Sequence, residues 1–114
     1  SALGKKQKAI EIIKRQIEQK DYSIGLFDYY QLGVTYFQVG DFENAKLAFQ
    51  KQSEINQLAE NLYYLGKIAK IENKITEYEV DKKRAIEFYK KGGNLKDNYT
   101  HHFNKVYLVT IENE

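Results

Sequence analysis

The chain has 114 residues, enough for one domain with a single modest core. It is 42% hydrophobic and 30% charged, with a mean hydropathy of -0.67 and a formal net charge of +2, which is typical of globular domains. Lys and Glu are interspersed through every segment, which argues against nucleic-acid binding, and the lack of cysteine excludes disulfides, thiolate metal sites and cysteine nucleophiles.

No stretch approaches 18 consecutive apolar residues, so we expect no membrane span. The absence of proline leaves long helices unobstructed and leaves the turns to Gly, Asn and Asp. Because the sequence does not begin with Met, we expect a trimmed or processed chain. The use of Lys, Ile, Asn and Tyr suggests an AT-rich, bacterial-type source.

The first predicted element is an amphipathic helix over residues 4–20. Its apolar residues recur at the spacing of one helical face, and they are Ala9, Ile10, Ile13 and Ile17. Lys and Glu occupy the opposite face. This apolar stripe is too narrow for an isolated helix, so we expect it to pack on a neighbour.

Residues 25–39 predict a second helix, in which Gly33 occupies an interior position. Glycine there costs about 1 kcal/mol relative to alanine, which indicates close approach of another helix. Gly40 is suited to end this helix, and Asp41 to cap a third helix that runs to about Ile55. We expect the small Ala45 of that helix to lie opposite Gly33, which makes the pair an antiparallel helix hairpin.

A variant of this pattern then returns. Leu65-Gly66 follows Leu32-Gly33 by 33 residues. A charged connector is expected over residues 73–79, after which Asp81 aligns with Asp41. Later positions align Tyr89 with Phe49, and Gly92-Gly93 closes the second hairpin. Residues 95–111 predict a trailing helix, although residues 107–111 would also suit a strand.

The first hairpin resembles the tetratricopeptide repeat, whose period is ~34 residues. The residues that carry the resemblance are Leu32-Gly33, Tyr36, Gly40-Asp41, Ala45 and Phe49, with Tyr29 at a usually aromatic place. Gln52 stands where that family usually has a small residue, and the proline at the end of the unit is missing. The second unit is similar to the related Sel1-like repeat through Asp81, Ala85, Phe88 and Tyr89.

This resemblance implies an all-α fold, a short right-handed α-solenoid of antiparallel helix hairpins with about six helices. The chain would be one domain, 1–114. Its parts would be a leading helix at 4–20, a first repeat at 25–55, a second repeat at 57–93 and a trailing helix at 95–111. The first helices of the repeats would line a concave surface.

The resemblance also implies which residues face that concave groove. They are Phe27, Tyr30, Val34, Phe37, Tyr63, Lys67, Lys70, His101 and Lys105. Aromatic side chains with lysines on one side suit a protein or peptide partner that has apolar anchors and acidic groups. The same aromatic residues are equally compatible with core packing, and the lysines with solvated surface.

Other functions find little support in the sequence. Members of the family that grip chaperone C-terminal carboxylates have Lys and Asn where this chain has Tyr30 and Val34, so we do not predict that ligand. Adjacent histidines such as His101-His102 point about 100° apart on a helix, which argues against a metal site. No motif with a catalytic mechanism is present, so we predict no enzyme activity and no cofactor.

The sequence therefore favours a protein-interaction module that binds a peptide or partner segment in its groove. Two alternatives stay open. The chain could be an inhibitor, immunity or regulatory protein that blocks a partner enzyme through a convex or loop surface, with residues 73–79 as the contact. It could also be one segment of a longer repeat scaffold.

Overall fold

The computed structural model describes residues 2–18, 27–95 and 106–114. Six α-helices and no strand lie within these ranges, so the all-α prediction is confirmed. The chain divides into two compact units, Ser1–Ile55 and Asn56–Glu114. A single stacked domain with right-handed coiling stays a prediction.

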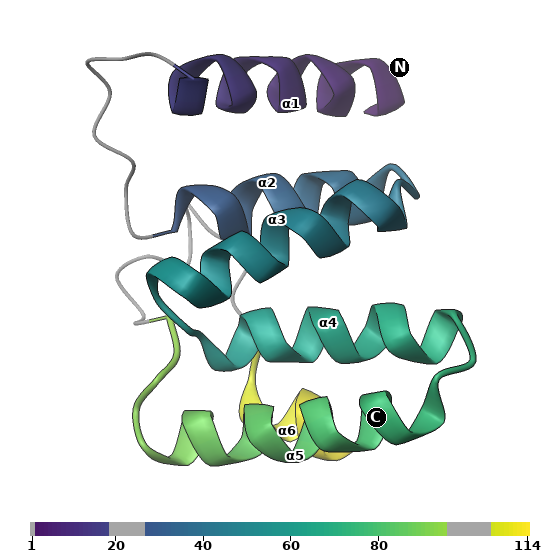
Figure 1. Ribbon diagram of the computed structural model, residues 1–114, viewed down its shortest axis with the longest axis vertical. Coiled ribbons are helices and arrows are strands. Elements are labelled where there is room, and N and C mark those ends of the chain that lie inside the picture. The colour runs from purple at the N-terminus through teal and green to yellow at the C-terminus, as the bar shows by residue number, and fades with distance from the viewer. Residues whose placement is uncertain (1, 19–26, 96–105) are drawn as a thin grey trace. The chain divides into compact units, whose positions relative to one another are not determined.

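The first unit contains α1 (Ala2–Glu18), α2 (Asp28–Gln38) and α3 (Phe42–Ile55). Helices α2 and α3 form a hairpin, and α1 packs on α2 (Figure 1). The predicted stripe of α1 supplies this contact, because Ile10 and Ile13 are buried. Packing against the hairpin therefore stabilises a helix whose stripe is too narrow for it to be stable alone.

Gly33 of α2 lies against the ring of Phe49 on α3. A methyl group added at Gly33 would lie 2.6 Å from Cε1 of Phe49, a distance that requires the ring to move. Phe49 is fully buried and also packs on Tyr30, with 6.0 Å between the ring centroids. The predicted close approach is confirmed, but the expected neighbour was wrong: the Phe49 ring, rather than the small Ala45, lies nearest to Gly33.

Three helices end in the same hydrogen-bonded motif, in which a residue with positive φ closes the helix. Gly40 has φ 83, and the N–H of Asp41 donates to Tyr36 O at 3.0 Å. Asn73 plays the same part after α4 with φ 63, and Gly92 after α5 with φ 82. Such Schellman ends satisfy carbonyls that the helix itself leaves unpaired. The roles predicted for Gly40 and Gly92 are confirmed.

Asp41 then caps the N-terminus of α3, as predicted. Its Oδ1 accepts from the Asn44 N–H at 3.2 Å, and its Oδ2 accepts from Asn44 Nδ2 at 2.8 Å. The side chain thereby satisfies one of the amide donors that the first turn of a helix leaves without a partner. One turn thus both ends α2 and starts α3.

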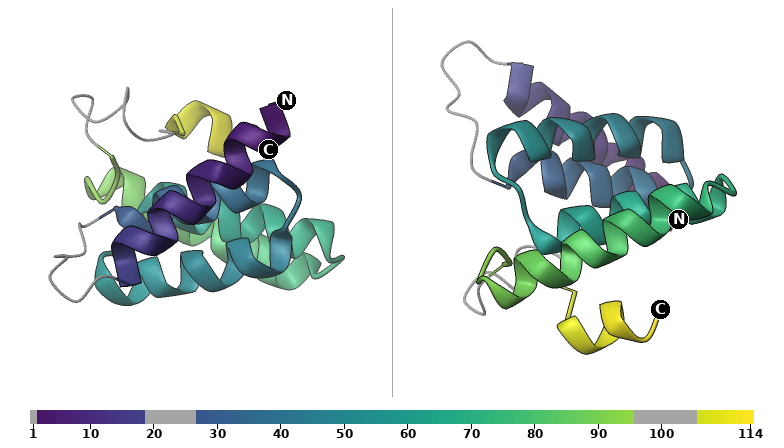
Figure 2. Two further views of the ribbon diagram at one scale, coloured as in Figure 1. Left: turned by 90° about the horizontal axis from the view of Figure 1, so that it is seen from above. Right: turned by 60° about the horizontal axis from the view of Figure 1, so that its bottom comes forward.

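The second unit contains α4 (Ala59–Ile71), α5 (Ile75–Lys90) and the short α6 (Leu108–Glu112). Helices α4 and α5 form a second hairpin, and α6 lies against α5 (Figure 2). One cluster of buried side chains joins the three helices, and its members are Leu62, Tyr63, Ala85, Val106 and Ile111. The core of this unit therefore includes residues from the last described segment.

Two predictions for this unit differ from the structure. The connector expected at residues 73–79 is wrong, because only residues 72–74 separate α4 from α5. Asp81 consequently lies within α5 rather than at its start, and the longer connector of a Sel1-like unit is absent. The trailing helix predicted over residues 95–111 also differs: Leu95, Val106 and Tyr107 are not helical, and α6 begins at Leu108.

Candidate partner-binding site

The structure places the predicted groove residues of the first unit at different depths. Tyr30 and Val34 are buried in the core, with 0% and 1% of their surfaces exposed. Phe27 and Phe37 are half-buried. Phe37 packs edge-on against Phe42 of α3, with 5.2 Å between the ring centroids. In this unit, Phe27 and Phe37 are the predicted residues that keep accessible surface.

In the second unit, Tyr63 and Lys67 of α4 form a polar cluster with Glu114. The Tyr63 hydroxyl donates to Glu114 Oε1 at 2.8 Å. Lys67 Nζ donates to the Tyr63 hydroxyl at 3.1 Å and lies 3.4 Å from Glu114 Oε1. The ammonium of Lys67 also lies 5.1 Å from the centroid of the Tyr63 ring. Two predicted partner-binding residues thus meet a carboxylate of the chain itself.

The protonation equilibria of this cluster favour the ion pair. The hydrogen bond from Tyr63 lowers the pKa of the Glu114 carboxyl against the opposing effect of burial, and the charges of Lys67 and Lys70 lower it further. Burial lowers the pKa of Lys67, but the hydrogen bond to Tyr63 and the Glu114 carboxylate outweigh it and raise that pKa. Burial and the hydrogen bond to Glu114 raise the pKa of the Tyr63 hydroxyl.

A direct titration tests this arrangement. We expect the pKa of Glu114, measured from its side-chain carbonyl shift by NMR, to lie below the ordinary value of about 4.3. Because the folded-state pKa is lowered, the cluster stabilises the fold above that value and loses this contribution as the pH falls through the folded-state pKa. Tyr63→Phe removes the principal hydrogen bond and should raise the pKa of Glu114. Tyr78→Phe, a matched control on α5, should not change it.

Among the predicted residues of this unit that the structure describes, Lys70 is the most accessible. It is exposed near the end of α4, and its ammonium lies 5.0 Å from the centroid of the Tyr78 ring on α5. Such a contact positions a cation at a surface with modest energy. His101 and Lys105, which were predicted to extend the groove, lie outside the described residues.

Two buried polar contacts were missed by the sequence interpretation. Gln52 is fully buried, and its Oε1 accepts from the Tyr30 N–H at 3.0 Å, in the first turn of α2. Glu60 is also fully buried, and both of its carboxylate oxygens lie 3.1 Å from the Leu95 N–H. The sequence does contain an indication of the contact between Gln52 and Tyr30. Gln52 is a polar residue at a position where the repeat family usually has a small one.

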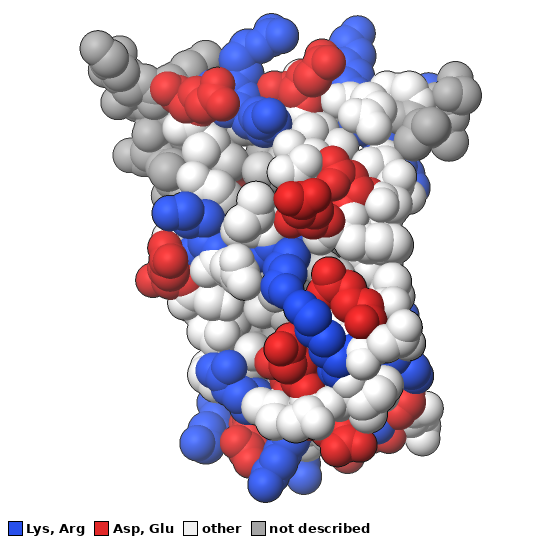
Figure 3. Space-filling model, turned by 45° about the vertical axis from the view of Figure 1, so that its right-hand side comes forward, with Lys and Arg blue, Asp and Glu red and all other residues white. Residues whose placement is uncertain are grey.

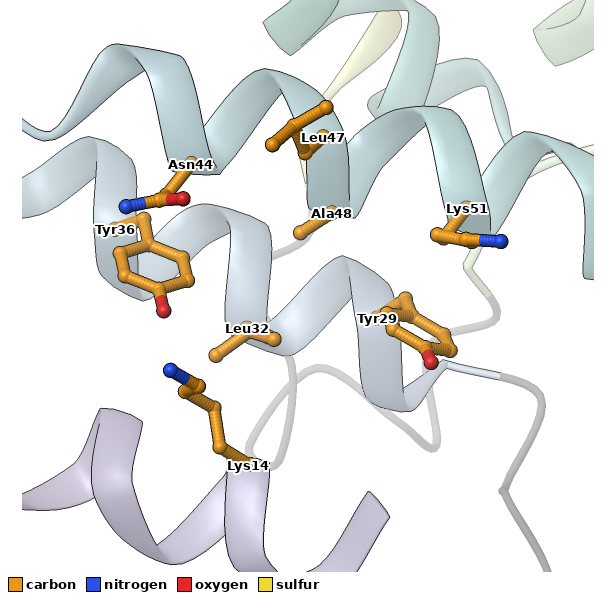
Figure 4. Close-up of a pocket in the computed structure, with 8 residues that line it drawn as sticks. All are labelled: Lys14, Tyr29, Leu32, Tyr36, Asn44, Leu47, Ala48 and Lys51. Carbon is orange, nitrogen blue, oxygen red and sulfur yellow. The ribbon is translucent and has the colours of Figure 1, made fainter. Parts of the chain in front are cut away.

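A hollow of about 190 Å³ lies between α1 and the first hairpin (Figure 4). Its lining residues are Lys14, Tyr29, Leu32, Tyr36, Asn44, Leu47, Ala48 and Lys51. Figure 4 shows Lys14 reaching from α1 toward Leu32 of α2. Ligand pockets usually measure about 300–1,000 Å³. We therefore interpret this smaller hollow as a packing gap beside α1.

The charged surface shows no segregation on the face drawn in Figure 3, where Lys and Arg are interspersed with Asp and Glu. Within the described ranges, no helix has the length and apolar character needed to cross a membrane. The same ranges contain no group of three or more His, Asp or Glu side chains placed to hold a metal ion.

Comparison with protein families matches residues 29–57 to the tetratricopeptide repeat. Comparisons with curated proteins and with solved structures gave no match. The matched residues cover nearly all of α2 and the whole of α3. These two helices form the hairpin in which the Phe49 ring packs against Gly33. Repeats of this family generally bind proteins and are generally not enzymes. Residues 29–57 therefore match one tetratricopeptide repeat, and the resemblance inferred for the first hairpin is confirmed.

Proposed function

We propose that the protein binds a segment of a partner protein through the first-helix faces of its hairpins. The observation that carries this proposal is the tetratricopeptide repeat at residues 29–57, since stacked repeats of this kind present extended surfaces to partners. The second hairpin repeats the interior glycine of the first, with Gly66 buried in α4. Each hairpin by itself therefore offers a first-helix face for the proposed binding.

The proposed partner segment is acidic and has apolar anchors. Lys70 is exposed and Lys67 is partly exposed on α4, while Phe27 and Phe37 offer half-buried aromatic surface in the first unit. Lysines recognise carboxylates, and partly exposed aromatic rings supply much of the binding energy at protein interfaces. Tyr30 and Val34 act in this proposal as core residues that support the surface, because both are buried.

A second surface supports the alternative in which the chain blocks a partner enzyme. The corner between α4 and α5 exposes two apolar side chains, Ile71 and Ile75, each of which is 50% exposed. Exposed apolar side chains gathered around one turn are a common feature of interaction surfaces. A continuation into a longer repeat scaffold stays a prediction.

Selection of peptides on the purified full chain tests these surfaces against each other. We expect a random dodecamer display library to yield peptides that combine Asp or Glu with large apolar residues. Lys70→Ala should weaken the selected peptides about threefold to fivefold, the effect expected for an exposed ion pair. Lys83→Ala removes the same charge from an exposed position on α5 and serves as the matched control.

The outcomes separate the candidates. Equal losses from Lys70→Ala and Lys83→Ala would mean non-specific charge attraction and would contradict the proposed surface. A loss caused by Ile75→Ser with no effect of Lys70→Ala would favour the corner between α4 and α5 instead. A library that yields no peptide above background would argue against peptide binding altogether.

A further inference from the structure

Residues 106–114 cover part of the hairpin formed by α4 and α5. Val106 and Ile111 are 8% and 0% exposed, and both belong to the cluster that contains Leu62 and Tyr63 of α4 and Ala85 of α5. Figure 2 shows α6 running beside α5 in this position. The segment therefore places two apolar side chains on the hairpin.

The same segment then places a carboxylate on the basic side chains of the hairpin. Glu114 Oε1 accepts from the Tyr63 hydroxyl at 2.8 Å and pairs with Lys67 at 3.4 Å. From α5, Lys82 Nζ donates to the main-chain oxygen of Glu114. Apolar anchors together with acidic groups are the features that the sequence predicts for an external partner.

Few buried contacts hold residues 106–114 on the hairpin. Helix α6 has five residues, and Tyr107 and Val109 within the segment are 57% and 62% exposed. An isolated helix of this length is not stable in water, so its order depends on the contacts of Val106, Ile111 and Glu114 with the hairpin. Segments held by few buried contacts open at lower free energy than the core that supports them.

We propose that residues 106–114 are an internal ligand of the α4–α5 face, and that an external segment with two apolar anchors and a following carboxylate binds there by displacing them. This inference rests on the proposed function and specifies one site for it. An external segment must then compete with residues 106–114 for this face. The effective concentration of residues 106–114 at the face reduces the affinity of any competitor, and a change that releases them exposes the site.

A labelled peptide with the sequence of residues 106–114 serves as the probe. We expect fluorescence anisotropy to show weak binding to the full chain. We expect at least tenfold tighter binding to an Ile111→Asp variant, because a buried charge expels the internal segment. In the Ile111→Asp chain, Lys67→Ala should weaken the peptide, and the matched exposed change Lys83→Ala should not. A peptide that itself carries Asp in place of Ile111 should not bind.

Circular dichroism first establishes whether the Ile111→Asp chain keeps its helices. If it does, equal peptide affinity for this variant and the unmodified chain overturns the inference. If its helicity is lost, Glu114→Gln decides, because it weakens only the polar contact and should still tighten the peptide by about twofold to fivefold. An unchanged affinity in that variant also overturns the inference.

A comparison with the peptide selection distinguishes this inference from the proposed function. Selected acidic and apolar peptides that compete with the labelled 106–114 peptide support both. Selected peptides that bind the full chain without competing leave the proposed function standing and overturn the internal-ligand inference. Failure of both probes to bind any form of the chain contradicts both.

Discussion

Gly33→Leu is expected to lower the free energy of unfolding by about 1–3 kcal/mol, the usual cost of overpacking a core. The reason is the Phe49 ring, three atoms of which would lie between 2.6 and 2.9 Å from the first carbon of any side chain at Gly33. Phe49 is fully buried and in contact with Tyr30, so its ring has little room to withdraw. Thermal or urea unfolding measures the effect.

Alanine at the same position makes the comparison sharper, because the second hairpin offers a matched control. A methyl group at Gly33 meets the Phe49 ring, whereas one at Gly66 would lie 3.3 Å from Asp81 Cβ, 3.6 Å from the Tyr78 carbonyl oxygen and 3.7 Å from the Tyr78 ring. Alanine is favoured over glycine inside a helix by about 1 kcal/mol. We therefore expect Gly33→Ala to destabilise the protein and Gly66→Ala to be neutral or stabilising.

A double-mutant cycle locates the cause. In a Phe49→Leu background the ring is gone, so Gly33→Ala should cost less than it does in the unmodified chain. Additive effects of the two substitutions would show that the ring does not limit the space at Gly33. A Gly33→Leu chain that melts like the unmodified protein would contradict the close packing of α2 on α3.

The turn after α4 shows why part of the fold could be predicted and part could not. Leu32-Gly33 and Leu65-Gly66 gave the repeat offset of 33 residues correctly. The same offset places Asn73 at the position of Gly40, and the structure uses both residues with positive φ to close a helix. Asparagine tolerates this conformation far less often than glycine. Residues 73–79 therefore looked like a connector, although a helix begins at Ile75.

The candidate site was less predictable than the fold, because the same residue types serve both core and surface. The resemblance to the repeat family assigned Tyr30 and Tyr63 to the groove-facing side of their helices, but it did not distinguish burial from exposure. Both side chains are buried, with 0% and 9% of their surfaces exposed. The partner of Lys67 could not be found from spacing at all, since Glu114 lies 47 residues away in sequence. Contacts of such long range depend on tertiary packing, which periodicity does not encode.

Buried polar groups show the same limit. Gln52 breaks the family pattern, and the structure gives a reason: its side chain accepts a hydrogen bond from the Tyr30 N–H, in the first turn of α2. A small residue at this position would leave that donor to find another partner. A departure from the family pattern thus marks a position where this chain makes a contact that the family usually lacks. The pattern alone does not say which atom the new side chain contacts.

Glu60→Ala is expected to destabilise the second unit by about 1–3 kcal/mol, the cost of leaving a buried hydrogen-bonding group without its partner. Both oxygens of Glu60 lie 3.1 Å from the Leu95 N–H, and both residues are fully buried. The neighbouring Gly93 carbonyl accepts from the Ala59 N–H at 2.7 Å. Residues 93–95 are therefore held at the start of α4 by hydrogen bonds to both Ala59 and Glu60. Without the hydrogen bond from Leu95 to Glu60, this segment should open locally at a lower free energy than the unfolding of the helices.

Amide hydrogen exchange at Leu95 measures this effect locally, while urea unfolding gives its total size. Glu60→Gln keeps an oxygen acceptor but not the charge, so it should protect the Leu95 amide better than alanine does, though less than the charged glutamate. Glu79→Ala removes an exposed carboxylate from α5 and should change stability by less than about 0.5 kcal/mol. If Glu60→Ala matched this control in both measurements, the bond to Leu95 would not hold residues 93–95 against α4. If Glu60→Gln were as harmful as alanine, the negative charge of Glu60, rather than its capacity to accept a hydrogen bond, would stabilise the segment.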